Sequence, residues 1–167
     1  MMTGTLTLTG TGQTMSVDAD LAAIRAIAEA VPDPELVVVT VGDLGIVRDI
    51  RTGDGTVEID VTPTYSACPA TLAIELEIET AVNSAGYAAA VRRVLSPAWT
   101  TDWLSEKGRL RLEKYGIAPP QIAGGPSRCP RCRSCKVEKI SQFGSTPCKA
   151  QWRCQECLEP FDYFKCI

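Results

Sequence analysis

The chain has 167 residues, a net charge of −3 and 45% hydrophobic residues, which suits one folded domain of usual size with room for a second small one. It contains eight cysteines but no histidine. The absence of imidazole excludes a Ser-His-Asp triad, a Cys-His dyad, a Cys2His2 finger, a Rieske centre and a Glu-x-x-His di-iron site. Any bound metal must therefore be held by thiolates or oxygens.

The N-terminal segment 1–15 is rich in Thr and Gly, and we expect a disordered tail there. It has neither the basic nor the apolar region of a secretory signal, and the chain has no apolar run long enough to span a bilayer. We therefore expect a cytoplasmic protein that does not contact membranes. In that compartment thiols stay reduced, so clustered cysteines usually bind metal rather than pair.

The first regular element that we expect is a helix over residues 16–31. Four apolar residues form one stripe at helical spacing there: Leu21, Ile24, Ile27 and Ala28. Two prolines directly after the stripe should end the helix, because proline cannot continue it.

A β-hairpin should follow over residues 46–62, where two alternating runs flank the turn Gly53-Asp54-Gly55. Alternate residues of its second strand should face opposite sides. The core-facing set is Val57, Ile59 and Val61, and the set that faces water is Glu58 and Asp60.

Residues 68–87 alternate like a strand, but we interpret them as a helix. The stretch is long, carries Pro69 at the first helical position and ends in Asn-Ser-Ala-Gly, a good helix stop. Residues 88–95 should then form a strand. Residues 101–116 should form a second amphipathic helical segment with a break near Gly108.

Residues 118–127 hold three prolines and two glycines and form the clearest linker of the chain. The charge changes across it, since residues 1–127 carry a net −7 and residues 128–167 a net +4. We therefore predict an acidic α+β domain over 16–117, the linker, and a basic cysteine-rich domain over 128–167. The basic residues of this second domain are scattered, so we interpret them as a solvated surface rather than a nucleic-acid interface.

Two Cys-x2-Cys pairs, with 21 residues between them, stand out in the second domain. The pairs are Cys129 with Cys132 and Cys154 with Cys157. Each pair can form a tight knuckle, and four thiolates satisfy tetrahedral Zn²⁺. The spacing is close to that of a zinc ribbon, and a domain of about 40 residues needs such a staple because its core is too small. We predict a small ribbon held by a structural Zn²⁺ ion.

The tail contains three more cysteines in addition to the four predicted zinc ligands. Cys135 extends the first pair toward a bacterial ferredoxin motif, but the fourth cysteine of that motif is missing, which favours zinc over an iron–sulfur cluster. We expect Cys135 to be a bystander beside the knuckle. Cys148 and Cys166 should pack as small hydrophobic side chains, with a second metal or ligand exchange as the alternative.

Cys68 is the one cysteine outside the tail, and it lies between a predicted strand and a helix start. A helix N-terminus favours thiolate over thiol. Asp33, Glu35 and Asp43 lie in loops that could meet this thiolate, and together they could hold iron transiently. From the residues alone, we favour a buried structural thiol over this metal-binding interpretation.

Three stretches, residues 33–35, 41–50 and 61–70, resemble a small α+β family tied to iron–sulfur cluster assembly. That family includes the SufT-like proteins and the MIP-type subunits of the cytosolic assembly machinery. Residues 143–166 resemble the C-terminus of the PaaD (PaaJ) family, whose members are subunits of ring-1,2-phenylacetyl-CoA epoxidase systems. The resemblance covers about residues 17–167 and implies a two-layer assembly-type domain followed by a zinc ribbon.

The resemblance also implies a noncatalytic accessory role in aerobic phenylacetate degradation. It matches the motif cysteine of the family to Cys68 and its acidic loop residues to Asp33, Glu35 and Asp43. It thus implies delivery of iron or an iron–sulfur cluster to the oxygenase or reductase subunits, with the ribbon docking the client. A structural or regulatory subunit, and an electron-transfer protein that uses the tail cysteines, remain as alternatives, and a homodimer remains open.

Overall fold

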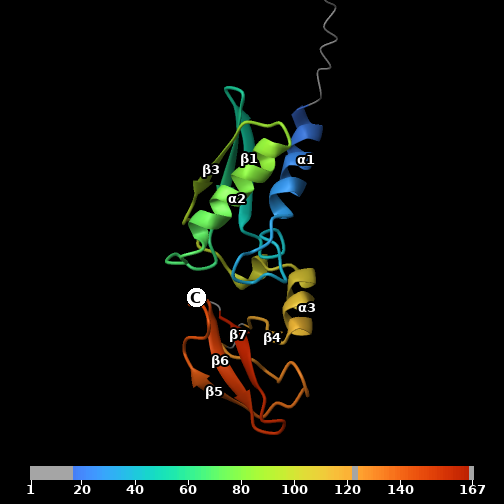
Figure 1. Cartoon of the computed structure of the whole chain (residues 1–167), viewed down its shortest axis with the longest axis vertical. Coiled ribbons are helices and arrows are strands. Elements are labelled where there is room, and N and C mark those ends of the chain that lie inside the picture. The colour runs from blue at the N-terminus through green and yellow to red at the C-terminus, as the bar shows by residue number, and fades with distance from the viewer. Residues whose placement is uncertain (1–16, 122–123, 166–167) are drawn as a thin grey trace, which may run out of the picture.

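The structure, a computed structural model, describes residues 17–121 and 124–165 and contains two β-sheets that follow each other along the long axis of the molecule (Figure 1). The predicted tail over residues 1–15 and Cys166 lie outside the described residues. The elements in chain order are α1 (Val17–Glu29), β1 (Val47–Gly53), β2 (Thr56–Val61), α2 (Thr71–Ser84), β3 (Ala89–Arg93), the 3-10 turn η1 (Thr101–Trp103), α3 (Glu106–Tyr115), β4 (Ile117–Ala118), β5 (Val137–Ser141), β6 (Lys149–Cys154) and β7 (Pro160–Phe164).

The first domain has two layers, a three-stranded sheet in the order β1-β2-β3 and the helices α1 and α2 (Figure 1). β1 pairs with β2 antiparallel, and β3 lies parallel to β2 because α2 makes the crossover between them. Apolar side chains of helices and strands are buried between the layers: Ile24, Ala28, Val57, Ile59, Val61, Ile74, Ile78 and Val82. The predicted α+β class and both of these helices are confirmed.

The predicted hairpin is confirmed, and its turn consists of Asp54 and Gly55, whose φ angles are 50° and 78°. Two successive residues with positive φ are typical of two-residue hairpin turns, because this backbone conformation matches the twist of the two strands that the turn connects. The three predicted core residues of β2 are buried. The alternation of this strand therefore sets which of its faces meets the helices.

The prediction that Asp60 faces water is wrong, because only 8% of this residue is exposed. Its carboxylate accepts hydrogen bonds from the guanidinium groups of Arg51 on β1 and Arg92 on β3, at 2.8 to 3.1 Å. Asp60 does point away from the helices, but the neighbouring strands cover it with two cations. A single-strand pattern cannot reveal such cross-strand partners.

Asp60→Asn should lower the free energy of unfolding by about 2 kcal/mol at pH 7, because hydrogen bonds to charged groups contribute roughly 1.5–3 kcal/mol. Arg51 and then Arg92 hold the pKa of this carboxyl well below its usual range. Its stabilisation is therefore complete above the ordinary Asp pKa of about 3.9 and is lost as the pH falls toward the depressed pKa of the folded state. Urea denaturation at pH 7 and pH 3 should show a smaller difference from wild type at pH 3.

Asp49→Asn is the matched control, since the Asp49 side chain also pairs with Arg51 but is 62% exposed. We expect this control to change stability by less than about 0.5 kcal/mol, as is usual for surface pairs. An equal loss of unfolding free energy in the two variants would contradict a special role for Asp60.

Two helix boundaries differ from the sequence prediction. α2 begins at Thr71 and not at Pro69, and the Thr71 hydroxyl donates to the Cys68 carbonyl oxygen at 2.9 Å. The second helical segment breaks at Ser105, whose hydroxyl oxygen accepts from the Gly108 N–H at 2.9 Å and caps α3. Gly108 lies inside α3 and permits close packing, because a Cβ there would come within 3.0 Å of the Asp43 carbonyl oxygen.

The second domain is a four-stranded sheet in the order β4-β7-β6-β5. β6 pairs antiparallel with both β5 and β7, as expected for the ribbon. β4 pairs parallel with β7 at the edge of the sheet. β4 therefore joins this sheet before the cysteine-rich part of the chain begins. The prolines Pro120 and Pro126, within the predicted linker, are buried.

The two domains pack through a shared hydrophobic cluster. Phe164 of β7 is 0% exposed and Cys148, just before β6, is 5% exposed, and both belong to the same buried cluster as the first-domain core. The Phe164 ring meets the Trp99 ring edge-on, with centroids 5.9 Å apart. This packing sets where the ribbon lies against the first domain. Among the described helices, none is long and apolar enough to cross a bilayer.

Candidate functional site

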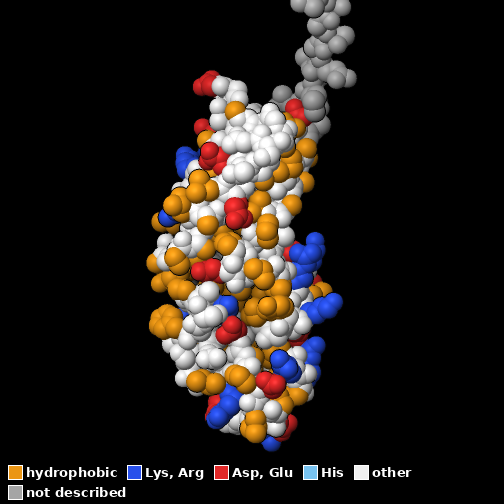
Figure 2. All heavy atoms as spheres, in the orientation of Figure 1, with side chains coloured by type: hydrophobic (Ala, Val, Ile, Leu, Met, Phe, Trp, Pro, Cys, Tyr) orange, Lys and Arg blue, Asp and Glu red, His pale blue; other side chains and the backbone are white. Residues whose placement is uncertain are grey.

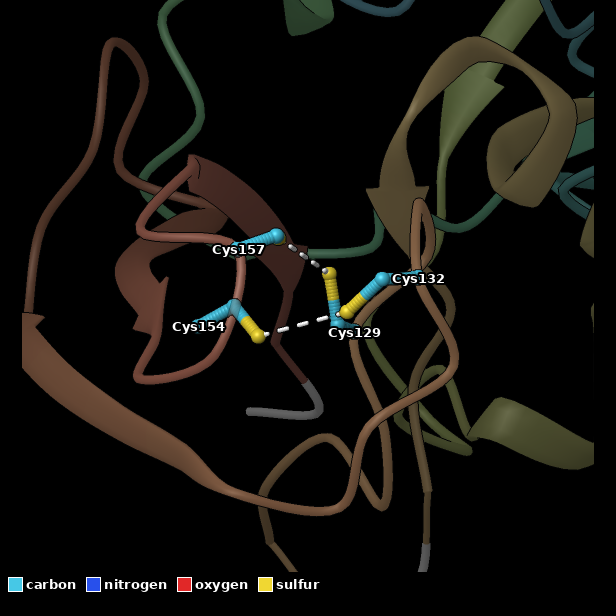
Figure 3. A group of neighbouring side chains, drawn as sticks. All are labelled: Cys129, Cys132, Cys154 and Cys157. Carbon is cyan, nitrogen blue, oxygen red and sulfur yellow. Dashed lines mark hydrogen bonds between the residues drawn. The ribbon is translucent and has the colours of Figure 1, made fainter.

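The four cysteines predicted as zinc ligands come together at one end of the ribbon (Figure 3). All four Sγ atoms lie within 4.8 Å of one another. The Cys129 and Cys157 sulfurs are 3.8 Å apart, and the Cys132 and Cys154 sulfurs are 3.5 Å apart. A tetrahedral Zn²⁺ ion with Zn–S bonds of about 2.3 Å places its sulfurs about 3.8 Å apart. The donor set and its spacing therefore fit zinc.

Each knuckle has the same local backbone conformation. The residue after the second cysteine of each pair, Arg133 or Leu158, has a positive φ of 65° or 61°. This left-handed residue reverses the chain, so that both sulfurs of a pair point inward. The N–H of Glu156 donates to the Cys154 sulfur at 3.4 Å, as knuckle amides do toward a thiolate.

Backbone N–H groups prepare Cys154 for metal binding. The backbone N–H of Cys157, aided by that of Glu156, lowers the pKa of Cys154 to about 6. This sulfur is therefore a thiolate at neutral pH, which is the form that binds metal. Cys135 is exposed and is absent from the four-cysteine group, as its expected bystander role requires.

Cys68 lies at a second group, in the first domain. Its Sγ atom is 3.9 Å from Glu35 Oε2, and Cys68, Glu35 and Asp33 line one cavity. Asp33 is buried, and its Oδ1 accepts from the backbone N–H groups of Glu35 and Leu36 at 2.8 and 2.7 Å. Asp33 therefore holds the loop in place, and Glu35 presents its carboxylate to the thiol.

The expectation that the helix N-terminus would favour the Cys68 thiolate is wrong. Burial raises the pKa of the Cys68 thiol, and the nearby Glu35 carboxylate raises it further. The N–H of Ala70 and the Thr71 hydroxyl act in the opposite direction but do not offset the burial. Without a bound cation, this sulfur is a thiol at neutral pH.

Asp43, the fourth residue predicted for this site, lies outside the Cys68 group. Its carboxylate is buried and pairs with Arg111 of α3 at 2.5 Å, and it accepts from the Thr40 N–H at 3.2 Å. It does not line the cavity at Cys68. Three of the four residues predicted for this site therefore come together, whereas Asp43 anchors α3 to its loop.

Cys148 is buried, as expected for a thiol that packs as a small hydrophobic side chain. However, the structure also places it in the wall of the Cys68 cavity, with its Sγ atom 3.9 Å from the same Glu35 Oε2. One signal in the sequence points to this role: Cys148 is left over once four tail cysteines are assigned to zinc.

The basic side chains of the ribbon are interspersed with acidic ones on the face shown in Figure 2. Five of the basic residues form ion pairs: Arg131 with Glu159, Arg133 with Glu113, Lys136 with Glu156, Lys149 with Asp162 and Arg153 with Glu138. Lys149 is buried, whereas the other four paired basic residues are exposed. Their pairing supports an ion-paired, solvated surface over a continuous basic patch.

Two parts of the chain match known protein families. Residues 21–95 match an iron–sulfur cluster assembly protein family, and residues 123–165 match the PaaD zinc beta ribbon domain. The chain is also 49% identical over 154 residues to an Escherichia coli (strain K12) protein described as one of the subunits of 1,2-phenylacetyl-CoA epoxidase. That match covers 86% of this chain and 92% of the E. coli protein.

The crystal structure of a domain of unknown function (DUF59) from Bacillus anthracis is similar to the first domain. The two chains are 26% identical, and their structures superpose with a TM-score of 0.53. The match covers 57% of this chain and 92% of the Bacillus anthracis chain. An iron–sulfur-assembly-type domain is thus followed by a zinc ribbon with four clustered cysteines, as predicted. Because nearly the full length of the E. coli relative is matched, the chain belongs to the PaaD family of phenylacetyl-CoA epoxidase subunits.

Proposed function

We propose that this chain is a noncatalytic accessory subunit that matures the iron or iron–sulfur centres of its partner subunits in a phenylacetyl-CoA epoxidase system. The observation that carries the proposal is the Cys68 group, a thiol beside a carboxylate in a domain of the assembly type. The absence of histidine supports an accessory role, because the chain cannot supply the imidazole ligands of a di-iron oxygenase site.

In this function Cys68 and Glu35 would hold the iron cargo, and Asp33 would keep Glu35 in place through its loop hydrogen bonds. One soft thiolate with carboxylate oxygens suits iron and makes few bonds to it. A site with few ligands releases its metal more readily than a closed four-thiolate cluster, as a delivery protein requires.

Zinc is the ion that we assign to the four-cysteine cluster. It would act as a structural staple, since four thiolates leave no open coordination position for a substrate. The ribbon that it holds would present the docking surface for the client subunit. An electron-transfer role for this cluster predicts iron instead, so metal analysis of anaerobically purified protein distinguishes the two.

The maturation role predicts that partner subunits made without this protein lack metal. The epoxidase subunits should be produced in cells that contain the wild-type chain, the Cys68→Ser variant, the Cys135→Ser variant or no copy of it. We expect iron and cluster content of the oxygenase and reductase to fall with Cys68→Ser to the level found without the protein. Cys135→Ser, which changes an exposed thiol outside both groups, should restore wild-type content.

Fully metallated partners in cells without the protein would sink the maturation role. If those partners also co-purified with this chain at fixed stoichiometry, a structural or regulatory subunit would be the better description.

A further inference from the structure

Two thiols from different domains face the same carboxylate oxygen. Cys68 Sγ of the first domain and Cys148 Sγ of the ribbon each lie 3.9 Å from Glu35 Oε2. The three residues are far apart in the sequence and meet only because the ribbon packs against the first domain through Phe164. Neither domain alone contains this group.

The side chains that line the cavity at this point are uncharged apart from its carboxylates. Among its described lining residues are two carboxylates and two thiols, and no Lys or Arg. Burial raises the pKa of Cys148 to about 11, and the Glu35 carboxylate adds to this effect. A bound cation favours the thiolate instead, because a thiol that coordinates a metal ion releases its proton to solvent.

The size of the cavity decides which cargo fits. Its free volume is about 10 Å³, roughly the room that one water molecule needs. A single metal ion fits this space. An iron–sulfur cluster, with at least two irons and two bridging sulfides, is larger than this space, so a single ion suits the cavity better.

An open groove lies beside the cavity. Glu35 and Leu36 also line an open groove of about 420 Å³ between the first domain and strands β6 and β7. Glu35 is half-buried, and its side chain belongs to the linings of both the groove and the cavity. Its carboxylate can thus capture an ion from the groove and pass it to the two sulfurs.

We propose that Cys68, Cys148 and Glu35 form a second metal site, which binds one thiophilic divalent ion, with Fe²⁺ as its cargo. Two thiolates and one carboxylate combine soft and hard donors, a set that suits Fe²⁺ and its spectroscopic substitute Co²⁺. Use of the bound ion for maturation rests on the proposed function, whereas binding itself does not.

Binding at this site should be weaker than at the zinc cluster. Among the described residues, only the four knuckle cysteines gather three or more potential ligand atoms within 4.8 Å of one another. Side chains of the second site must therefore move inward to close on an ion, which lowers affinity. This reversibility agrees with a cargo site rather than a structural one.

Anaerobic titration of the full-length, zinc-loaded protein with Co²⁺, and then with Fe²⁺, tests the proposal. We expect uptake of one ion beyond zinc, with thiolate-to-metal charge-transfer absorption for Co²⁺. Cys148→Ser and Cys68→Ser should each weaken binding by about tenfold or more and roughly halve that absorption. Cys135→Ser should bind as wild type does, and zinc analysis after the titration must show that zinc is retained.

Glu35→Gln is the second variant, because its half-buried side chain is replaced without loss of volume. It should weaken Co²⁺ binding while the absorption for each bound ion stays unchanged, since both thiolates remain. Wild-type binding by a folded Cys148→Ser variant would overturn the two-domain site and leave the maturation role of Cys68 standing. Failure of the wild-type protein to take up a second ion would overturn the site as well.

Discussion

Replacing Cys154 with serine is expected to remove zinc from the protein and unfold the ribbon. Cys154 is 0% exposed and its sulfur lies 3.5 Å from that of Cys132, so no other side chain can replace it without rebuilding the knuckle. Structural zinc contributes about 10–16 kcal/mol of apparent free energy in small zinc domains, which is comparable to the whole stability of an ordinary domain. A ribbon without zinc should therefore not stay folded.

Zinc analysis and a ¹H–¹⁵N NMR spectrum of the full chain measure this result. We expect zinc to fall from one ion per chain to none, and the amide signals of residues 124–165 to lose their dispersion. Signals of the first domain should persist but shift, because Phe164 and Cys148 leave its core. Cys135→Ser is the matched control and should keep both zinc and the native spectrum. Retention of zinc by a folded Cys154→Ser variant would show that another thiol completes the cluster.

Phe164→Ala should detach the ribbon from the first domain while leaving zinc in place. The Phe164 side chain is fully buried, meets Trp99 edge-on and lies at the end of β7, outside both Cys-x2-Cys knuckles. Truncation of a buried phenylalanine costs about 3–5 kcal/mol through lost burial and the cavity left behind. That loss is large enough to open the contact between the domains.

Urea denaturation, zinc content and Co²⁺ titration separate the consequences. We expect the free energy of unfolding to drop by about 4 kcal/mol, zinc to stay at one ion per chain, and the second Co²⁺ to be lost because Cys148 moves away from Glu35. Phe143→Ala is the control, since the Phe143 side chain is 62% exposed and removal of it should cost little. Unchanged stability and Co²⁺ uptake in Phe164→Ala would contradict the role of this ring in joining the domains.

Features that depend on neighbouring residues are predictable from the sequence. The hairpin follows from a short glycine-rich turn and from the alternation of its second strand. Each half of the four-cysteine cluster follows from a Cys-x2-Cys pair, because each knuckle is a local turn. The helix α2 is distinguished from a strand by its length and its stop signal, despite alternation at its start. The turn, each knuckle and the helix stop are decided by residues that lie close together along the chain.

Features that depend on which distant segments touch are visible only in the folded molecule. Asp60 is enclosed by arginines of two other strands, and Asp43 pairs with Arg111 of α3 instead of joining Cys68. The thiol pKa of Cys68 rises because tertiary packing buries it beside Glu35, an effect larger than that of the local helix start.

The Cys-x2-Cys spacing is enough to predict a four-thiolate ribbon, and the resemblance of three stretches to a known family adds a domain of the iron–sulfur-assembly type. They do not predict that Cys148 of the ribbon shares Glu35 with Cys68 of the first domain, which the packing of the two domains reveals. The physical reason is that this meeting depends on how the hydrophobic side chains of both domains fit together, and no periodicity within either domain encodes that contact.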